Sequence, residues 1–332
     1  MLISKRILVT GGAGFIGSHL TDHLLDLGHK VIVLDNLSNG KLENLSLAIG
    51  NENFKFIEGS ILDFDKCKEA CEGVDVIYHL ACLGVRHSIH SPFENHQVNA
   101  EGTLNLLLAA RAQKVEQFIY ISTSEIYGKT TVFPITEDNL THPLTVYGSS
   151  KLAGEHYTNS FFECYGMNTT VLRIFNNYGP RAHYEGDSGE IIPRTIVNAL
   201  NGVSPVIFGD GSITRDFFFV KDTAKVLGML LDLKNVSGKT FNLGTGVEIS
   251  MKQLVEQIIE LMPENKISIN YMPDRPADVP RLWVNASKIR KLLEIKDETT
   301  FIDGLKESIQ FYSELDKTND LLKNIKTINW EK

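Results

Sequence analysis

Two short segments bring together residue types that can transfer a proton. Thr123, Ser124 and Glu125 end one apolar run, and a second segment has Tyr147 four residues before Lys151. Residues four apart on a helix lie on the same face, so the lysine ammonium can sit beside the tyrosine hydroxyl. A neighbouring cation lowers the pKa of a phenol, which would make Tyr147 a workable general base. The same spacing occurs in ordinary helices, so the pair alone identifies no reaction.

A glycine-rich turn offers a place for a phosphate. The segment Gly11–Gly17 lies between the apolar run Ile7–Thr10 and a helical pattern that ends near Leu27. Glycine permits close approach of the backbone to a phosphate, and a helix N-terminus supplies N–H groups and a favourable dipole. This is the arrangement of a Rossmann pyrophosphate turn. The expected cofactor contacts here are Gly11, Gly14, Phe15, Ile16 and Gly17.

Asp35 favours NAD over NADP as the cofactor. It follows the apolar run Val31–Leu34, slightly further from the first glycine than the roughly 20 residues typical of the acidic residue that binds the adenosine ribose. A carboxylate there accepts hydrogen bonds from the ribose diol and repels a 2′-phosphate. The alternative interpretation is a turn residue at a strand end, followed by Asn36.

The pattern of strands and helices around these residues predicts an α/β fold. Up to about Ile126, β-branched apolar runs alternate with amphipathic stretches, which is typical of a parallel sheet with crossover helices. The expected strands are Arg6–Thr10, Lys30–Leu34, Val74–Leu80, Gln117–Ser122 and Thr169–Arg173. The expected helices are Ala100–Gln113, Ser149–Glu163, Ser250–Leu261 and Ala286–Leu293.

The pattern predicts a Rossmann-type doubly wound parallel sheet with a smaller C-terminal α/β substrate-binding lobe. Residues 1–175 form the cofactor domain, with returning segments at roughly 216–245, and residues 176–332 form mainly the lobe. The active site then lies between them, at the C-terminal ends of the parallel strands.

Composition favours a cytoplasmic protein with small-molecule partners. The formal net charge of −8 over 332 residues argues against binding to nucleic acid or an anionic membrane surface. The first residues do not form a signal peptide, no stretch reaches transmembrane length, and four cysteines without an export signal indicate reduced thiols. No metal site is expected, because neither Cys67 and Cys71 nor His87 and His90 have further ligands at suitable spacing.

The ordered motifs together resemble extended short-chain dehydrogenases/reductases that act on nucleotide sugars as 4-epimerases, 4,6-dehydratases or uronic acid decarboxylases. The matching segments are Thr10–Gly17, Asp35–Ser38, His79–Ala81, Asn99–Thr103, Thr123–Gly128, Tyr147–Lys151, Leu172–Arg181, Arg215–Phe217 and Arg275–Asp278. The resemblance implies that Tyr147 removes the proton from the sugar O4 while the C4 hydride passes to the nicotinamide of NAD. It also implies that Thr123 hydrogen-bonds O4 and that Lys151 holds the nicotinamide ribose.

The resemblance implies further contacts and a homodimer that pairs the helices Ala100–Gln113 and Ser149–Glu163. The remaining cofactor contacts would be Asn36, Ser38, Asn39, Ser60, Ile61, Leu80, Ala81 and Asn99. The substrate, a UDP-hexose or UDP-N-acetylhexosamine, would contact Ser88, Asn176, Pro193, Phe208, Arg215, Arg275 and Asp278. Guanidinium groups also suit a diphosphate on physical grounds. Ser60 departs from the family pattern, in which many relatives have an Asp that accepts from the adenine amino group.

Glu125 indicates chemistry at C5. A ketone at C4 makes the C5 proton acidic, and its removal needs a base that a simple 4-epimerase does not need. The resemblance adds that dehydratases and decarboxylases have Glu here, whereas epimerases usually have a small or neutral residue. A carboxylate that only hydrogen-bonds the next loop is the structural alternative.

Ser124 leaves the net reaction open. Hexose 4,6-dehydratases usually have an Asp in this place, and a hydroxyl is far too weak an acid to replace it. Either Glu125 performs both transfers, or the reaction is a C5 proton transfer or a decarboxylation, for which Arg86 or Arg181 could hold the substrate carboxylate. A 4-epimerase is a further alternative. A non-catalytic NAD-binding sensor is disfavoured because Tyr147 and Lys151 are both present.

Overall fold

A parallel sheet forms the centre of the molecule. The computed structural model describes residues 4–231, 233–264, 267–275, 278–296 and 298–331. Within them, seven strands pair in parallel, and their order reverses between β1 and β4, which confirms the doubly wound sheet. From one edge to the other the strands are β11 (Lys239–Leu243), β6 (Thr169–Ile174), β5 (Gln117–Thr123), β4 (Val76–His79), β1 (Arg6–Thr10), β2 (Lys30–Asp35) and β3 (Phe54–Glu58).

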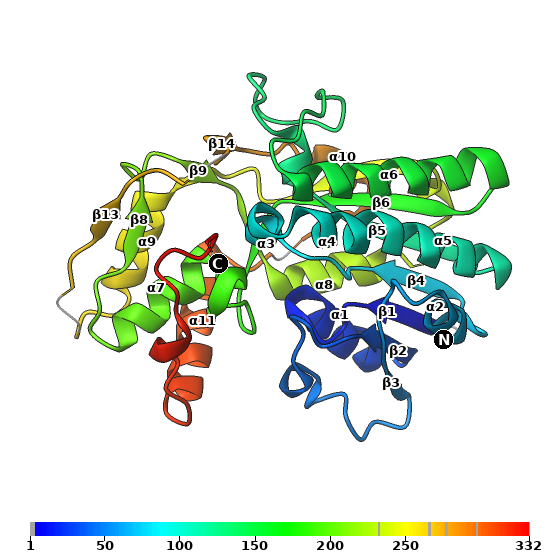
Figure 1. Ribbon diagram of the computed structural model, residues 1–332, viewed down its shortest axis with the longest axis horizontal. Helices are drawn as coiled ribbons and strands as arrows, with labels where there is room; N and C mark the ends of the chain where they lie inside the picture. The colour runs from blue at the N-terminus through cyan, green and yellow to red at the C-terminus, as the bar shows by residue number, and fades with distance from the viewer. Residues whose placement is uncertain (1–3, 232, 265–266, 276–277, 297, 332) are drawn as a thin grey trace.

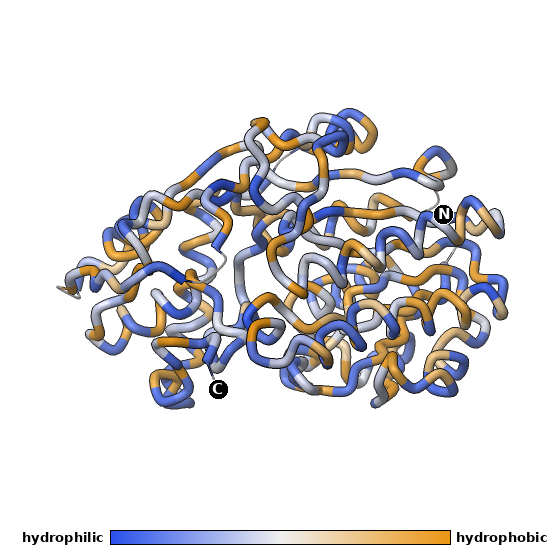
Figure 2. The backbone as a smooth tube through the Cα atoms, turned by 45° about the horizontal axis from the view of Figure 1, so that its top comes forward, coloured by the Kyte–Doolittle hydropathy of each residue, from blue (hydrophilic) through white to orange (hydrophobic). Residues whose placement is uncertain are grey.

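Helices cover both faces of this sheet (Figure 1). On one face, α1 (Phe15–Asp26) packs against α8 (Val220–Met229). The other face carries α2 (Phe64–Cys71), α5 (Gly102–Ala112) and α6 (Val146–Tyr165). Separate apolar clusters fill the two interfaces, and Figure 2 shows apolar segments running through the larger, right-hand part of the molecule. The central strands are therefore buried on both sides, which is why they read as continuous apolar runs.

A smaller lobe lies beside the C-terminal ends of the strands, in the left half of Figure 1. The third apolar cluster of the molecule lies in this lobe and includes residues of α7, α9 and α11. The remaining helices and strands are α3 (Val85–His90), α4 (Pro92–His96), α7 (Ile191–Leu200), α9 (Met251–Glu260), α10 (Ser287–Leu293), α11 (Phe301–Asp316), β7 (Asn176–Tyr178), β8 (Val206–Phe208), β9 (Thr214–Arg215), β10 (Phe217–Phe219), β12 (Ile249–Ser250), β13 (Asn270–Met272) and β14 (Arg281–Leu282).

The chain returns from this lobe to the large sheet. After β10, α8 packs on α1 and β11 pairs with β6. The exact division of the chain into two domains stays a prediction. Among the described residues, no helix has both the length and the apolar character needed to cross a membrane.

Helix α6 begins earlier than the sequence pattern predicts. The Thr145 hydroxyl accepts a hydrogen bond from Gly148 N at 3.1 Å, and this cap starts the helix at Val146 rather than Ser149. Tyr147 therefore lies in the first turn, one turn before Lys151. The sequence pattern also misses β3 and the helices α7, α8 and α11.

Candidate active site

A cavity of about 510 Å³ opens where the sheet meets the smaller lobe. Its wall contains residues that follow β1, β2, β4, β5 and β6, together with residues of α7, β8 and β9. This is the edge of a doubly wound sheet at which ligands bind.

Most of the residues singled out in the sequence meet at this cavity. All five expected catalytic residues line it: Thr123, Ser124, Glu125, Tyr147 and Lys151. So do the expected cofactor residues Gly11, Gly14, Phe15, Ile16, Gly17, Asp35, Asn36, Ser38, Asn39, Ser60, Ile61, Leu80 and Ala81. The expected substrate residues in the wall are Asn176, Pro193, Phe208, Arg215, Arg275 and Asp278. Pro276 and Ala277, which belong to a matched motif, lie outside the described residues.

Asn99 and Ser88 are not brought to the cavity, although both were expected to contact ligands. The Asn99 amide donates to Leu83 O at 2.9 Å and its oxygen accepts from Leu83 N at 2.8 Å. The Ser88 hydroxyl donates to Val85 O at 2.6 Å. Leu83 and Val85 line the cavity, so the buried Asn99 and Ser88 position the backbone of the cavity wall through these hydrogen bonds.

The glycine turn fits a pyrophosphate. Gly11 has φ +70°, and a Cβ on Gly17 would lie 2.2 Å from Gly11 O, so a side chain at either place would disturb the turn. Within the described chain, no side chain caps α1 at Gly14. The first N–H groups of α1 are therefore left for an anion, and Phe15, Ile16 and Gly17 line the cavity.

Asp35 closes the same end of the cavity. Its carboxylate accepts from Ala13 N at 3.0 Å and from Leu37 N at 2.8 Å. Burial raises the pKa of this carboxyl, and the two backbone hydrogen bonds oppose the rise. Each carboxylate oxygen has a second lone pair, so both can also accept from a ribose hydroxyl.

Burial dominates the pKa of Tyr147, and the expectation that Lys151 lowers this pKa stays a prediction. Burial raises the pKa of the Tyr147 hydroxyl well above its usual value, the Cys82 thiol adds to this rise, and the hydrogen bond with Thr123 opposes it. The Lys151 ammonium instead donates to Ile121 O at 2.6 Å and lies 4.3 Å from the centre of the Tyr120 ring. Burial also lowers the pKa of Lys151.

Glu125 faces the cavity next to Thr123, whose hydroxyl accepts from Glu125 N at 3.2 Å. Burial raises the pKa of the Glu125 carboxyl, while Arg215 and Arg275 act to lower it. Within the described residues, no side chain donates a hydrogen bond to this carboxylate, so it is available to a ligand. Ser124 also lines the cavity but is 3% exposed.

Two arginines meet at a single carboxylate oxygen. Arg215 and Arg275 each donate an Nη2–H to Asp278 Oδ1 at 2.7 Å. Arg215 also donates to Val279 O at 2.7 Å, which fixes its guanidinium. Nearby in the wall, Asn176 Oδ1 is buried without a partner in the described structure, and a ligand donor would satisfy it. These groups suit a phosphorylated polar ligand.

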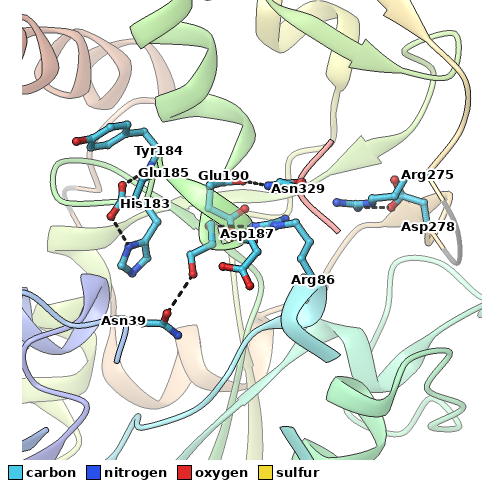
Figure 3. A network of polar contacts seen from close by, with 12 residues as sticks. Asn39, Arg86, His183, Tyr184, Glu185, Asp187, Glu190, Arg275, Asp278 and Asn329 are labelled. Carbon is cyan, nitrogen blue, oxygen red and sulfur yellow. Dashed lines mark hydrogen bonds and ion pairs between the residues drawn. The ribbon is translucent and has the colours of Figure 1, made fainter. Parts of the chain in front are cut away.

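The loop 183–190 contributes residues that the sequence motifs did not reveal (Figure 3). Arg86 donates through Nε to Asp187 O at 2.7 Å and through Nη2 to Ser188 O at 3.0 Å, and it pairs with Glu190 at 2.7 Å. Asn329 Nδ2 donates to Gly189 O at 3.0 Å and also lines the cavity. These partners are about a hundred or more residues apart, and no local spacing indicates such contacts.

Arg181, a candidate cation for a substrate carboxylate, and the two histidines His87 and His90 lie near this loop. Arg181 is outside the cavity lining and pairs with Asp22 at 2.7 Å. His87 pairs with Glu94 at 3.2 Å and His90 with Asp187 at 2.7 Å. In the part of the chain that the structure describes, no three His, Cys, Asp or Glu side chains gather as metal ligands.

Comparison with known proteins identifies the family. The sequence model described as GDP-mannose 4,6 dehydratase matches residues 8–308. The chain belongs to this family. Its resemblance to extended short-chain dehydrogenases/reductases of the nucleotide-sugar epimerase and dehydratase group, and the prediction of an enzyme, are thereby confirmed.

Members of the dehydratase family with different reactions are similar to the chain. The UDP-glucose 4-epimerase of Mycolicibacterium smegmatis is 34% identical over 312 residues, covering 92% of this chain and 98% of the relative. The UDP-N-acetyl-alpha-D-glucosaminuronate decarboxylase of Bacillus cytotoxicus is 33% identical over 329 residues, covering 95% and 99%. The structure of a dTDP-glucose 4,6-dehydratase from Streptomyces venezuelae, solved with NAD bound, has a TM-score of 0.90 at 29% identity, covering 96% and 99%.

Proposed function

We propose that this protein is an NAD-dependent enzyme that oxidises a nucleotide-activated hexose at C4 and then moves a proton at C5, as a 4,6-dehydratase does. The observation that carries the proposal is the Glu125 carboxylate, which faces the same cavity as Tyr147 and has no protein donor among the described residues. A carboxyl of raised pKa can both accept and donate a proton, so it suits chemistry beside a C4 ketone.

The glycine turn and Asp35 would hold the cofactor. The turn offers the N–H groups of α1 to the pyrophosphate, and Asp35 offers two oxygens to the adenosine ribose. NAD supplies the hydride acceptor when bound. Residues 1–175, with the returning segment at roughly 216–245, would form the cofactor domain.

Tyr147 and Thr123 would act at the sugar O4. Both side chains line the same cavity, and Thr123 acts on the pKa of the Tyr147 hydroxyl, so both hydroxyls could meet a single oxygen of the substrate. As a phenolate, Tyr147 would accept the O4 proton, and the buried Lys151 ammonium would stabilise the negative charge of that phenolate. Glu125 would then remove the C5 proton.

Arg215 and Arg275 would bind the diphosphate of a UDP-hexose or UDP-N-acetylhexosamine. Asp278 holds both guanidinium groups through one oxygen and leaves its other oxygen for a ribose hydroxyl. The diphosphate would then lie on the side of the cavity that the smaller lobe forms.

Paired substitutions test the C5 role. Tyr147→Phe should abolish turnover, because it removes the proton acceptor for O4. Glu125→Gln should keep NAD and UDP binding but reduce turnover by about 100-fold or more, the typical scale of a lost general base. Products are identified by mass for loss of water or carbon dioxide and by NMR for epimers. Full turnover in Glu125→Gln would exclude the C5 role and favour a 4-epimerase.

A UDP-sugar 4-epimerase is the second candidate. Ser124 favours it, because this buried hydroxyl cannot supply the proton that a departing C6 hydroxyl needs. The similarity to the mycobacterial 4-epimerase also supports it. In that case the NMR spectrum would show a C4 epimer of unchanged mass.

A cytoplasmic homodimer completes the proposal. The outer faces of α5 and α6 carry a half-buried to exposed apolar stripe formed by Leu104, Leu108, Ala153 and Tyr157. Two such stripes can form the four-helix interface that the family resemblance implies.

A further inference from the structure

A uronic acid substrate would place a second anion close to Glu125. C6 is bonded to C5, so a carboxylate at C6 would lie beside the group that is proposed to act at C5. Stable binding of that carboxylate requires a cation with donors to spare. In the described cavity wall, the Lys and Arg side chains are Arg86, Lys151, Arg194, Arg215 and Arg275.

Three of these cations are committed elsewhere, and the fourth, Arg194, only in part. The Lys151 ammonium donates to Ile121 O at 2.6 Å. Arg194 donates through Nη2 to Lys326 O at 2.7 Å and to Thr327 O at 2.9 Å, but its buried Nε has no partner in the described structure. Arg215 and Arg275 are both paired with Asp278 and are the proposed diphosphate ligands. Arg86 and the Nε of Arg194 are left as candidate partners of a sugar carboxylate, and the charge of Glu190 acts on both arginines.

Arg86 is already neutralised from within the protein (Figure 3). Its Nε and Nη2 donate to two backbone oxygens of the loop 183–190, and Nη2 also pairs with Glu190 Oε1 at 2.7 Å. The Arg86 side chain is 11% exposed, whereas that of Glu190 is 49% exposed. The anionic partner therefore presents more surface to a ligand than the cation does.

Glu190 also acts on the proposed reacting groups. Its charge contributes to the raised pKa values of both Glu125 and Tyr147, although burial is the largest cause for each. Within the described residues, no side chain donates to Glu190 Oε2, so this oxygen can accept from a sugar hydroxyl. It would repel a carboxylate at the same place.

We infer that the Arg86–Glu190 pair makes this enzyme select a sugar that is uncharged at C6 and reject the corresponding uronic acid, with Glu190 as the specificity-determining residue. The inference rests on the proposed function, because it assumes that a nucleotide sugar lies in this cavity with C5 near Glu125. It separates this chain from the decarboxylases within its family.

Binding measurements on the NAD-loaded protein test this selectivity. All proteins carry Tyr147→Phe, so that no ligand is turned over during calorimetry. In this background we expect UDP-glucose to bind at least tenfold more tightly than UDP-glucuronate. Adding Glu190→Gln should free Arg86 and lower this ratio by tenfold or more, chiefly by strengthening UDP-glucuronate binding. Equal affinities in the starting protein would overturn the inference.

Three further variants locate the effect at the pair. Glu94→Gln removes the same charge from another carboxylate in the cavity wall and should change the ratio by less than twofold. Arg86→Met/Glu190→Gln should not gain affinity for UDP-glucuronate, because the freed cation is gone. Arg86→Met alone should raise the preference for UDP-glucose over UDP-glucuronate, since it leaves Glu190 unpaired. This variant tests the inference if Glu190→Gln does not fold. A Glu190→Gln ratio equal to that of Glu94→Gln would contradict the inference.

The outcomes separate this inference from the proposed function. Binding of both nucleotide sugars with equal affinity removes the selectivity but keeps the nucleotide-sugar site. If UDP, UDP-glucose and UDP-glucuronate all fail to bind the NAD-loaded protein, the proposed UDP-sugar substrate is wrong and the inference falls with it.

Discussion

Burial raises the pKa of both Glu125 and Tyr147, but the consequences for catalysis differ. A carboxyl with a raised pKa is a stronger base when ionised, and it holds the proton that it has accepted more firmly. A phenol with a raised pKa stays protonated, so its deprotonation depends on the groups placed around it. The Thr123 hydroxyl is one such group.

The acid side of the pH profile should report Glu125. The ionised carboxylate is the base, so kcat/KM should fall as the pH drops through a pKa that lies above the usual value of 4.5. Initial rates across the acid range measure this limb. Glu125→Gln should lack it in its residual activity, whereas Glu94→Gln should keep it. The same limb in Glu125→Gln would assign the titration to another group.

Asp35 should control the choice between the two nicotinamide cofactors. Asp35→Asn keeps an oxygen for Ala13 N or Leu37 N but removes the charge that repels a 2′-phosphate. We expect NAD to bind about tenfold more weakly and the preference for NAD over NADP to shrink, as measured by fluorescence titration. Asp63→Asn, at the cap of α2 and outside the cavity wall, is the matched control. An unchanged preference would remove Asp35 from cofactor selection.

At the scale of elements, a buried ion pair fastens α6 to the sheet. Arg173 in β6 donates to Glu155 in α6 at 2.8 Å and to the Tyr127 hydroxyl at 2.8 Å. The side chains of Arg173 and Glu155 are 9% and 2% exposed. The pair therefore helps to set the position of the helix that carries Tyr147 and Lys151.

Arg173→Met should destabilise the protein by about 3–5 kcal/mol, because it leaves the buried Glu155 carboxylate without its cation. Denaturant unfolding followed by circular dichroism measures the loss. The double variant Arg173→Met/Glu155→Leu should recover part of it, since no buried charge then remains unpaired. A loss below about 1 kcal/mol in the single variant would show that water or another donor replaces Arg173.

The sequence predicts an element well when the residues that determine the element are neighbours in the chain, and poorly when they are distant. Strands β1 and β2 are apolar on both faces and sit next to the glycine turn, so their positions follow from the pattern. Strand β3 lies at the sheet edge and includes the charged residues Lys55 and Glu58, so its apolar run is interrupted and gives a weaker signal. The site follows the same rule, because the Arg86–Glu190 contact spans 104 residues and no motif encodes it.

At the scale of the whole molecule, the outer stripe on α5 and α6 should determine assembly. Leu108 is 39% exposed on α5. Leu108→Glu should convert a dimer into a monomer in light-scattering measurements, because a charge in an apolar interface is costly to bury. Leu47→Glu changes a leucine that is 74% exposed elsewhere and should leave the mass unchanged. A monomeric parent protein would rule out the proposed dimer.

The four cysteines differ sharply in their surroundings. Burial raises the pKa of Cys67 and of Cys71 to about 12, which makes both poor nucleophiles. Cys164 is exposed, and Cys82 lines the cavity beside Tyr147. In a Cys164→Ser background, an alkylating reagent should therefore react chiefly at Cys82. The rate of that single modification would report when a ligand covers the site, so the protein carries its own occupancy probe.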